Sequence, residues 1–327
     1  MSAQPAFAAT PTIYDCAAWG AKPPSAPVSV LASRPDKIIV HHTAGANSTD
    51  YSLAHAFTVA RQIQDFHMTG NGWIDSGQHF TNSRGGYVLE GRHESLNSLV
   101  NGGKHVVSAH CTGQNNVAVG IENEGTYTTV APTAQQYAKL VDLCAYIARQ
   151  YGLRAYQIWA HRDFNNTQCC GDVLYSMLPQ LRRDVAAQIG GDPAAPVWPV
   201  LQSGNTGESV RTLQYLLRYW GSSITADGSY GPATQSAVTS FQSARKAVAD
   251  GIAGNQTWNQ AVLNVSLGQT GEAVKAVQSQ LSAHGIPTTV DGVFGSGTQS
   301  GVKTFQSSRS LPVDGLVDAR TWDALLG

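Results

Sequence analysis

The chain has 327 residues, 13% of them charged, and a formal net charge of −1. This length is sufficient for two or three domains with sizeable cores. The sequence has neither a basic patch that would favour a nucleic-acid partner nor an acidic tail. It also lacks an apolar stretch near the ~18 residues that a transmembrane helix requires, so we expect no membrane span.

The N-terminal sequence MSAQPAFAATPT lacks the basic and apolar regions of an intact export signal. Its Ala-Phe-Ala triplet fits a small-residue cleavage site. We therefore interpret residues 1–13 as the remainder of a trimmed export signal behind an added methionine. A disordered native terminus is the alternative.

An α/β domain with a central mixed sheet flanked by helices is predicted for residues 14–189, because short apolar segments alternate with amphipathic ones. Residues 14–32, rich in Ala, Pro and Ser, are expected to be irregular. A buried strand begins at Lys37 and ends in two histidines, His41 and His42. In chain order we then expect a helix over 50–68, strands at 78–81, 86–90 and 117–122, a helix from a Thr133–Gln136 capping box to Gly152, a strand at 158–161 and a helix over 174–189 with a kink at Pro179.

Residues 190–196, GGDPAAP, have the composition of a linker, and after them the sequence repeats itself. A shift of 64 residues superposes Gly207 on Gly271, Phe241-Gln242 on Phe305-Gln306, and Thr257-Trp258 on Thr321-Trp322. A long repeat without insertions indicates two copies of one small helical unit, at 197–263 and 264–327. We expect the aromatic residues of the repeat to lie in the core and its glycines to serve turns.

Two separate segments carry residues that suit a metal ion. His41 ends the first strand, and the later sequence HRDFNNTQCCGD places His161 and Cys169 eight residues apart in a polar loop. Histidine and cysteine are both good Zn²⁺ ligands, and three protein ligands leave a fourth position for water, as in catalytic zinc sites. We therefore interpret His41, His161 and Cys169 as a zinc-binding set. The alternative is a pair of strand-end histidines in the core or at the surface.

Six motifs occur in the order and spacing of one family: HHTAG, WIDSGQHF, EGR, AHCTGQN, VGIENEGT and HRDFNNTQC. Residues 14–189 thereby resemble the zinc-dependent N-acetylmuramoyl-L-alanine amidases related to phage lysozyme-amidases and peptidoglycan recognition proteins. The two C-terminal copies resemble the three-helix peptidoglycan-binding domain. The resemblance implies hydrolysis of the amide between N-acetylmuramic acid and L-alanine, with Zn²⁺ as cofactor and the peptidoglycan of the bacterial cell wall as partner.

The resemblance also implies a catalytic acid and base. In one branch of the family this group is the first glutamate of the VGIENEG motif, which is Glu122 in this chain. Strand alternation places Gly120, Glu122 and Glu124 on one face. Other branches use a tyrosine before the histidine of the WIDSGQHF motif, but Gln78 stands there and cannot exchange a proton. This departure puts a tyrosine mechanism in doubt. The alternative to a catalytic role for Glu122 is a structural carboxylate at the rim of the sheet.

Further residues are expected around the metal. Thr167 occupies a position that is lysine in some relatives, and we expect it to contact the oxyanion of a tetrahedral intermediate as a weaker, neutral donor. The candidates for the substrate groove are Gln78, His79 and His110. The two histidines are also candidates for supporting the metal ligands. We expect surface or structural roles for the remaining histidines.

The chain has five cysteines, and four remain if Cys169 binds metal. Four cysteines allow three pairings. Family members more often have a proline after the ligand cysteine, where this chain has Cys170. We favour the pairs Cys111–Cys170 and Cys16–Cys144, which would indicate an oxidising compartment. Reduced, buried cysteines in a cytosolic enzyme are the alternative.

We expect a secreted, cell-wall-associated zinc amidase that acts as a monomer and carries two wall-binding modules. A non-catalytic recognition protein with the same fold is the alternative. Such proteins typically lose a zinc ligand, the cysteine above all, whereas this chain retains all three. A metal-dependent amidase or peptidase with another substrate would also fit the zinc set, but the twin repeats argue against it.

Overall fold

The computed structural model describes residues 10–327, so the predicted signal remnant at 1–13 lies almost entirely outside the described residues. The chain divides into two compact units. One reaches to Arg162 and includes Thr167–Ala194, and the other consists of Asp163–Asn166 and Ala195–Gly327. Within residues 10–327, no helix combines the length and the apolar character needed to cross a membrane.

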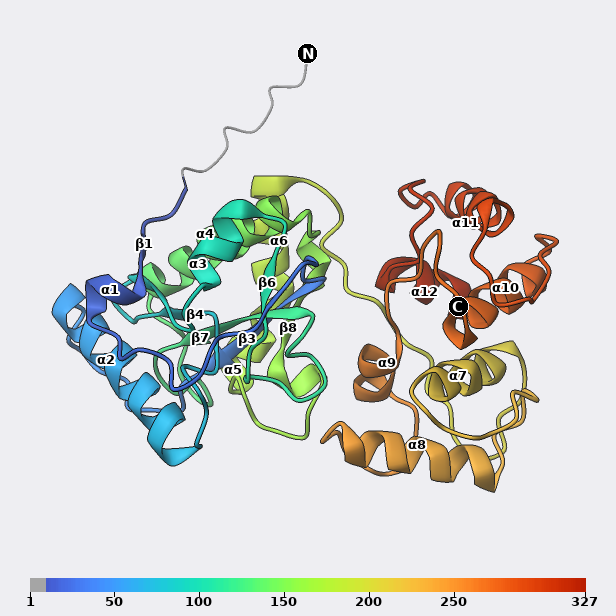
Figure 1. Ribbon diagram of the computed structural model, residues 1–327, viewed down its shortest axis with the longest axis horizontal. Helices are drawn as coiled ribbons and strands as arrows, with labels where there is room; N and C mark the ends of the chain where they lie inside the picture. The colour runs from blue at the N-terminus through green and yellow to red at the C-terminus, as the bar shows by residue number, and fades with distance from the viewer. Residues whose placement is uncertain (1–9) are drawn as a thin grey trace, which may run out of the picture. The chain divides into compact units, whose positions relative to one another are not determined.

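The first unit is built on a six-stranded mixed sheet, which confirms the predicted fold class (Figure 1). The strand order is β1-β5-β4-β7-β3-β8, in which β4 and β5 are antiparallel and the other neighbours are parallel. A separate antiparallel ladder joins β2 to β6. The strands are β1 Ile13–Tyr14, β2 Val30–Leu31, β3 Lys37–His42, β4 Phe80–Asn82, β5 Val88–Glu90, β6 His105–Val106, β7 Ala118–Asn123 and β8 Ile158–Ala160.

Strand β3 lies between β7 and β8 and is parallel to both. Its β-branched residues 38–40 are buried, as expected of a strand covered on both faces. His41 pairs in register with Glu122 of β7, and Val40 pairs with Ala160 of β8. Because the carboxyl ends of parallel strands meet at one edge, the three strands deliver their last residues to the place where open α/β sheets bind ligands.

Helices cover both faces of this sheet. Helices α4 and α6 share a hydrophobic core with one face, which includes Val88 of β5. The next residue, Leu89, belongs to a second cluster on the opposite face, together with Trp19 of α1 and Ala56 of α2. The helices of this unit are α1 Cys16–Trp19, α2 Leu53–Asp65, α3 Ser95–Asn101, α4 Ala134–Tyr151, α5 Asp172–Ser176 and α6 Leu178–Ile189, with the short turns η1 Phe66–Gly70, η2 Ala155–Gln157 and η3 His161–Asp163.

Two expected features of the helices differ in detail. The expected irregular segment 14–32 contains α1, because Asp15 caps it by accepting a hydrogen bond from the Ala18 N–H at 2.8 Å. Pro179 does not kink a continuous helix. It lies in the first turn of α6, after a break at Met177, where the missing N–H of proline is no loss.

The predicted capping box of α4 is half formed. Thr133 Oγ1 accepts a hydrogen bond from the Gln136 N–H at 3.1 Å, as predicted. The Gln136 side chain instead donates to Asn82 O and Glu124 O, both at 3.0 Å. The glutamine therefore fastens α4 to the ends of β4 and β7, which the local sequence signal did not indicate.

The second unit contains helices from both sequence repeats around one shared hydrophobic core. Trp258 and Trp322, equivalent residues of the two copies, are both fully buried, as predicted. Gln280 of α10 donates to Thr212 of α7 at 2.9 Å, so the two copies are also joined by a buried polar contact. The helices are α7 Glu208–Tyr219, α8 Pro232–Ala244, α9 Asn255–Ala261, α10 Glu272–Ala283, α11 Ser296–Ser308 and α12 Ala319–Leu326.

Each copy contains the same polar turn twice. Gln242 Oε1 accepts a hydrogen bond from the Gly251 N–H at 2.9 Å. Its Nε2 donates to Asp250 Oδ1, Ile252 O and Thr257 Oγ1 at 2.9–3.0 Å. Equivalent bonds centre on Gln214, Gln278 and Gln306. The turns have the sequences DGSYGPAT, DGIAGNQT, DGVFGSGT and DGLVDART, so a shorter repeat lies inside the longer one. We call this arrangement the glutamine-centred turn.

The structure does not confirm the predicted disulfides. All five cysteines lie within residues 10–327. Cys16 packs with Trp19 in one hydrophobic cluster, whereas Cys144 lies in the other, so the sheet separates their environments. Cys111 and Cys170 are both buried, and Cys170 packs into the core shared with α4. The pairing was inferred from sequence position, and both the pairing and the oxidising compartment stay predictions.

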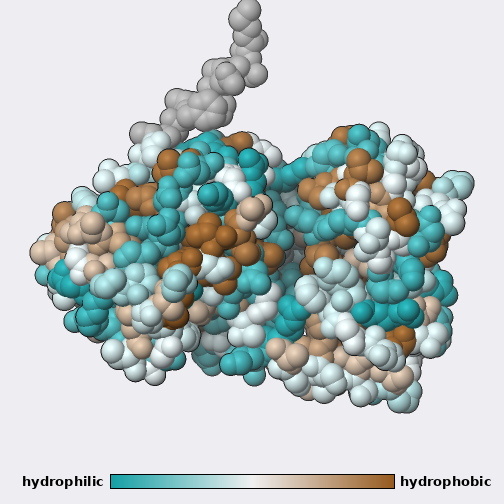
Figure 2. Space-filling view, viewed as in Figure 1, coloured by the Kyte–Doolittle hydropathy of each residue, from teal (hydrophilic) through white to brown (hydrophobic). Residues whose placement is uncertain are grey.

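Apolar residues are also present at the surface of both units. In Figure 2, hydrophobic and hydrophilic residues are interspersed over the visible face. Large exposed apolar side chains include Phe66 and Val100 in the first unit and Val197 and Leu267 in the second. Scattered exposed apolar residues are normal on protein surfaces, so they do not by themselves mark a binding face.

Candidate metal centre and its cavity

The predicted site residues meet on one face of the sheet, at the carboxyl ends of β3 and β7. On β3, Val40 points into the core shared with α4 and α6, so His41 points to the opposite face. On β7, Ile121 points into the same core, so Gly120 and Glu122 share the face of His41. Strand alternation thus places a histidine and a carboxylate side by side on the face away from α4 and α6.

Three segments bring His41, His161 and Cys169 together. His41 lies near the end of β3, His161 directly follows β8, and Cys169 lies in the loop after η3. One ligand atom from each residue lies within 4.8 Å of the others. Cys169 Sγ is 3.7 Å from His41 Nδ1, and the rings of His41 and His161 have centroids 4.6 Å apart. All three line a cavity of about 390 Å³.

The chemistry of this donor set suits Zn²⁺. Burial, followed by the neighbouring His161, holds the pKa of His41 well below its usual value, so the ring is neutral and can offer a lone pair. Burial raises the pKa of the Cys169 thiol, and the His42 N–H donates to its Sγ at 3.4 Å. A buried thiol among neutral imidazoles becomes a thiolate when a divalent cation supplies the missing positive charge. Two imidazoles and a thiolate form a known zinc set, so these residues fit that metal.

His110 contacts a member of this set. Its Nδ1 lies 2.9 Å from His41 Nε2, and its Nε2 lies 3.3 Å from the carbonyl oxygen of Ala118. The two rings meet edge to face with centroids 4.8 Å apart. Burial lowers the pKa of His110 to about 3, so its ring is neutral. His110 therefore supports a candidate ligand rather than forming a separate part of the site.

Glu122 faces the same cavity as the candidate ligands. Its Oε2 is buried and has no hydrogen-bond partner among residues 10–327. Burial raises the pKa of Glu122 to about 8, so without a nearby cation the carboxyl group holds a proton at neutral pH. A carboxyl group poised near neutrality can both accept and return a proton.

The other predicted residues have distinct positions. Gln78 and Thr167 line the cavity. Gln78 Nε2 donates to Thr81 Oγ1 at 3.0 Å, while its Oε1 has no partner among the described residues. Thr167 Oγ1 accepts a hydrogen bond from the Cys169 N–H at 3.2 Å, which holds the loop of the candidate ligand.

His79 is not one of the described residues that line this cavity. It is buried, its Nδ1 accepts from the Gly120 N–H at 3.0 Å, and its Nε2 donates to Val106 O at 2.8 Å. Both ring nitrogens are thus bonded to the backbone, and the structure assigns His79 to the framework behind the site rather than to a substrate groove.

Two aromatic residues of the cavity escaped the sequence analysis. His67 and Trp73 line it, and their rings have centroids 4.8 Å apart. His67 Nδ1 accepts from the Gly77 N–H at 3.1 Å, and burial lowers the pKa of His67 to about 4. A Cβ at Gly77 would approach the Trp73 ring to 2.4 Å, so the tryptophan and the glycine of the WIDSGQHF motif are required together. That motif carried a signal for Trp73, but the π-helical turn η1 that carries His67 has no sequence signature.

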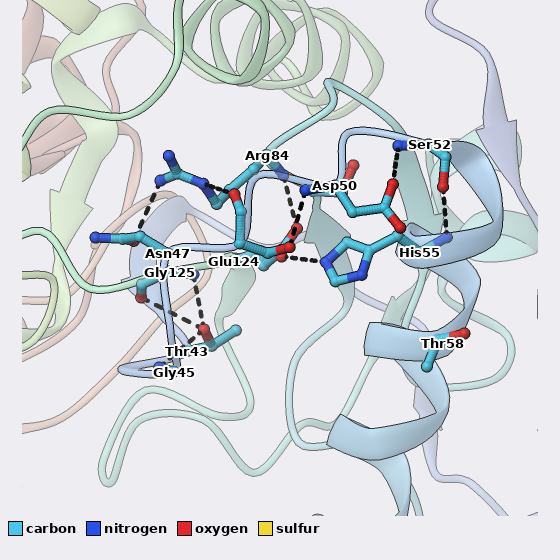
Figure 3. Close-up of polar contacts among 12 residues, drawn as sticks. Thr43, Gly45, Asn47, Asp50, Ser52, His55, Thr58, Arg84, Glu124 and Gly125 are labelled. Carbon is cyan, nitrogen blue, oxygen red and sulfur yellow. Dashed lines mark hydrogen bonds and ion pairs between the residues drawn. The ribbon is translucent and has the colours of Figure 1, made fainter.

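Glu124, which follows β7, has a structural position. Figure 3 shows its carboxylate between His55 of α2 and Arg84. Its Oε1 lies 2.7 Å from His55 Nε2, and its Oε2 accepts from the Arg84 N–H at 2.8 Å. The Arg84 side chain donates to Ser48 O and Asn47 Oδ1 at 2.8 and 3.1 Å. Glu124 therefore ties the loop after β3 to α2, and of the two motif glutamates only Glu122 faces the cavity.

Comparisons with known protein families match both units. The profile of the N-acetylmuramoyl-L-alanine amidase family matches residues 31–172. The profile of a peptidoglycan binding domain matches twice, at residues 206–260 and 270–325. The first match contains every candidate metal ligand, and the second and third fall on the two sequence repeats.

Individual proteins are similar to parts of this chain. The N-acetylmuramoyl-L-alanine amidase of Sus scrofa is 32% identical over 177 residues, which are 53% of this chain and 28% of the pig protein. Peptidoglycan-recognition protein SC2 of Drosophila simulans is 30% identical over 166 residues, 50% of this chain and 83% of the relative. The solved structure of wild-type Drosophila PGRP-LB shares 26% identity with a TM-score of 0.45, over 51% of this chain and 92% of that one.

The chain thus spans less than a third of the mammalian amidase and most of the insect recognition protein. It belongs to the family of N-acetylmuramoyl-L-alanine amidases and peptidoglycan recognition proteins, and it carries two peptidoglycan-binding domains.

Proposed function

We propose that this chain is a Zn²⁺-dependent enzyme that hydrolyses the amide bond between the lactyl group of N-acetylmuramic acid and L-alanine in peptidoglycan. One observation carries the proposal. His41, His161 and Cys169 place their ligand atoms within 4.8 Å of one another, and Glu122 faces the same cavity with a buried oxygen that no described residue bonds.

His41, His161 and Cys169 would hold the metal through two neutral imidazoles and a thiolate. Zn²⁺ bound in such a site supplies Lewis acidity to the amide carbonyl and makes water a nucleophile near neutral pH. Thr167 fixes the backbone of Cys169 through its hydroxyl oxygen, so the hydroxyl proton can be donated to the developing oxyanion of the substrate.

Glu122 would act first as the general base and then as the general acid of the reaction. Its carboxylate takes one proton from the attacking water, whose oxygen bonds to the carbonyl carbon. When the C–N bond breaks, Glu122 returns that proton to the departing nitrogen, which becomes the free amine of L-alanine. A divalent cation in the same cavity would favour the charged carboxylate, which is the form that accepts the proton of the water.

Gln78 would bind substrate without exchanging a proton. Its side chain is held by Thr81, and the unpartnered Oε1 offers an acceptor at the cavity. A tyrosine at this position could act as an acid, whereas an amide cannot. The proposal therefore places acid and base chemistry on Glu122 alone.

A non-catalytic recognition protein is the second candidate, because a relative covered over 83% of its length is named for peptidoglycan recognition. The complete donor set and the unpartnered Glu122 oxygen favour the enzyme. The two C-terminal domains would bind the wall polymer and raise the local concentration of the catalytic site on it. With this substrate, we propose that the protein acts outside the cytoplasm.

Mass spectrometry of the soluble products released from purified peptidoglycan, with and without a chelator, tests the proposal. We expect free stem peptides that begin at L-alanine, and we expect the chelator to abolish their release. Retained zinc and adsorption to the wall without any released peptide would reject the enzyme and favour the recognition protein.

A further inference from the structure

We propose that His110 is a positioning residue that fixes the tautomer of His41, so that His41 presents Nδ1 to the metal. The inference rests on the metal site proposed above and extends it to a residue that does not itself bind the ion. It also gives a function to Gly120, the first glycine of the VGIENEG motif, which has no side chain with which to act.

The tautomers follow from what each atom can donate. The Ala118 carbonyl oxygen can only accept, so the proton of the neutral His110 ring must lie on Nε2. His110 Nδ1 then carries a lone pair and accepts from His41 Nε2, 2.9 Å away. With its proton on Nε2, the neutral His41 ring has its lone pair on Nδ1, the atom that lies 3.7 Å from Cys169 Sγ.

Space for this arrangement comes from Gly120 on β7. A Cβ built at Gly120 would lie 2.5 Å from His110 Cδ2, 2.6 Å from Cγ and 2.8 Å from Nε2. These distances are too short for any side chain, so the His110 ring can lie against β7 only where the strand has a glycine. The contact places the ring between the Ala118 carbonyl and His41 Nε2.

Without His110, the hydrogen bond that favours one tautomer of the His41 ring would be missing. Its Nε2–H would lose its acceptor, and the competing tautomer would place the proton on the nitrogen that must bind the metal. Partners of metal-ligating histidines typically change metal affinity by about 10–100-fold when they are removed. We expect an effect of that size for His110.

Zinc affinity, measured by competition with a chromophoric chelator, tests the inference independently of activity. We expect His110→Phe, which keeps a ring but removes the acceptor, to weaken zinc binding about 10–100-fold. His110→Asn retains an acceptor oxygen near the position of Nδ1, so we expect it to recover a substantial part of the affinity. The visible spectrum of the Co²⁺-substituted protein should change in His110→Phe, because the orientation of one ligand is no longer fixed.

A double-mutant cycle separates positioning from general damage. Gly120→Ala should weaken zinc binding in the wild-type background, because the new Cβ displaces the His110 ring. In a His110→Ala background the same change meets no ring, so we expect little further loss. Gly103→Ala is the matched control, since its nearest neighbouring atom lies 3.9 Å from the added Cβ.

Three outcomes are decisive. Unchanged zinc affinity in His110→Phe, with lowered thermal stability of the chelator-treated protein, would assign His110 a purely structural role and overturn the inference. Equal losses from Gly120→Ala in both backgrounds would overturn the proposed link between the two residues. A wild-type protein that binds no zinc would instead overturn the metal site on which the inference rests.

Discussion

Gln242 in the second unit and Gln78 in the first are equally buried, at 2% exposure each, yet their amide groups differ. Both atoms of the Gln242 amide are bonded, and the same pattern recurs at three further glutamines. Gln78 uses its Nε2 alone and leaves Oε1 without a partner in the described chain. The first amide joins a turn to a helix, and the second borders a cavity.

For these two residues, the contrast separates an amide that builds the fold from one that can still bind a ligand. An unpaired buried polar group destabilises a protein, so folds usually satisfy all of them. In all four glutamine-centred turns, both polar atoms of the glutamine amide are hydrogen-bonded. In the cavity, Gln78 and Glu122 break this rule within reach of the candidate metal ligands, which is where a substrate can supply the missing partners.

The largest effect should come from Glu122→Gln, which keeps the shape of the side chain but removes its proton exchange. We expect kcat on peptidoglycan to fall by about 10²–10⁴-fold, the usual contribution of a general acid and base. Zinc content should stay unchanged in elemental analysis. Glu94→Gln, an exposed glutamate of the same unit, serves as the control. A variant with normal turnover would remove Glu122 from the mechanism.

Acid should weaken the first unit selectively, because it buries neutral histidines. Burial lowers the pKa of both His67 and His105 to about 4. The unfolded chain, with histidine pKa values of about 6.5, binds more protons than the folded one between pH 6.5 and 4. Its free energy of unfolding should therefore fall over that interval, by up to about 1.4 kcal/mol per pH unit for each histidine.

Urea unfolding at a series of pH values, with chelator present, measures this loss. The control is a His67→Gln and His105→Gln double variant, whose pH dependence should be flatter than that of the wild type. The second unit has no buried histidine among its described residues, so its transition should vary less. A first-unit transition that is constant from pH 6.5 to 4 would contradict the prediction.

Replacing each glutamine by methionine tests the comparison most directly. Gln242→Met leaves the Gly251 N–H without its acceptor and removes the hydrogen bond that Thr257 Oγ1 accepts, and we expect a loss of about 3 kcal/mol in the free energy of unfolding. Gln78→Met removes one hydrogen bond, to Thr81, so we expect a loss of at most about 1 kcal/mol. Urea titrations followed by circular dichroism measure both. Equal losses would show that the two amides do not differ in function.

The smallest effect should come from the cap of α4. Thr133→Ala removes the acceptor of the Gln136 N–H, and N-cap losses typically cost about 1 kcal/mol of stability. Thr133→Ser retains the hydroxyl and should be close to wild type in the same titration. A loss well above that of Gln78→Met would place the cap among the principal supports of the fold.

Much of the sheet could be predicted, because β3 and β7 are marked by local patterns. Continuous β-branched residues identified β3, and alternation along β7 placed Glu122 opposite the core. The two-residue strands β1, β2 and β6 could not be predicted, since so short a segment has no periodicity. Their pairing depends on partners distant in sequence.

The sequence selected candidate site residues but could not show the contacts between them. Motifs selected His41, His161 and Cys169, yet spacing could not show that their ligand atoms approach within 4.8 Å. The contact of His110 with His41 requires the glycine at 120, and only coordinates reveal that a Cβ there would strike the ring. A count of thiols carries no information on which side of the sheet each lies, so it could not show that Cys16 and Cys144 belong to different hydrophobic clusters.

The shared core of the two repeats fixes the distance between them. Modules on a flexible tether can search for a second ligand over a wide range of separations, whereas two copies fused through one core present their surfaces at a single spacing. If both copies bind the wall, their combined avidity will be high only where the polymer offers two ligands at that spacing. The C-terminal unit would then select regions of the wall whose ligands repeat at this spacing, in addition to holding the protein there.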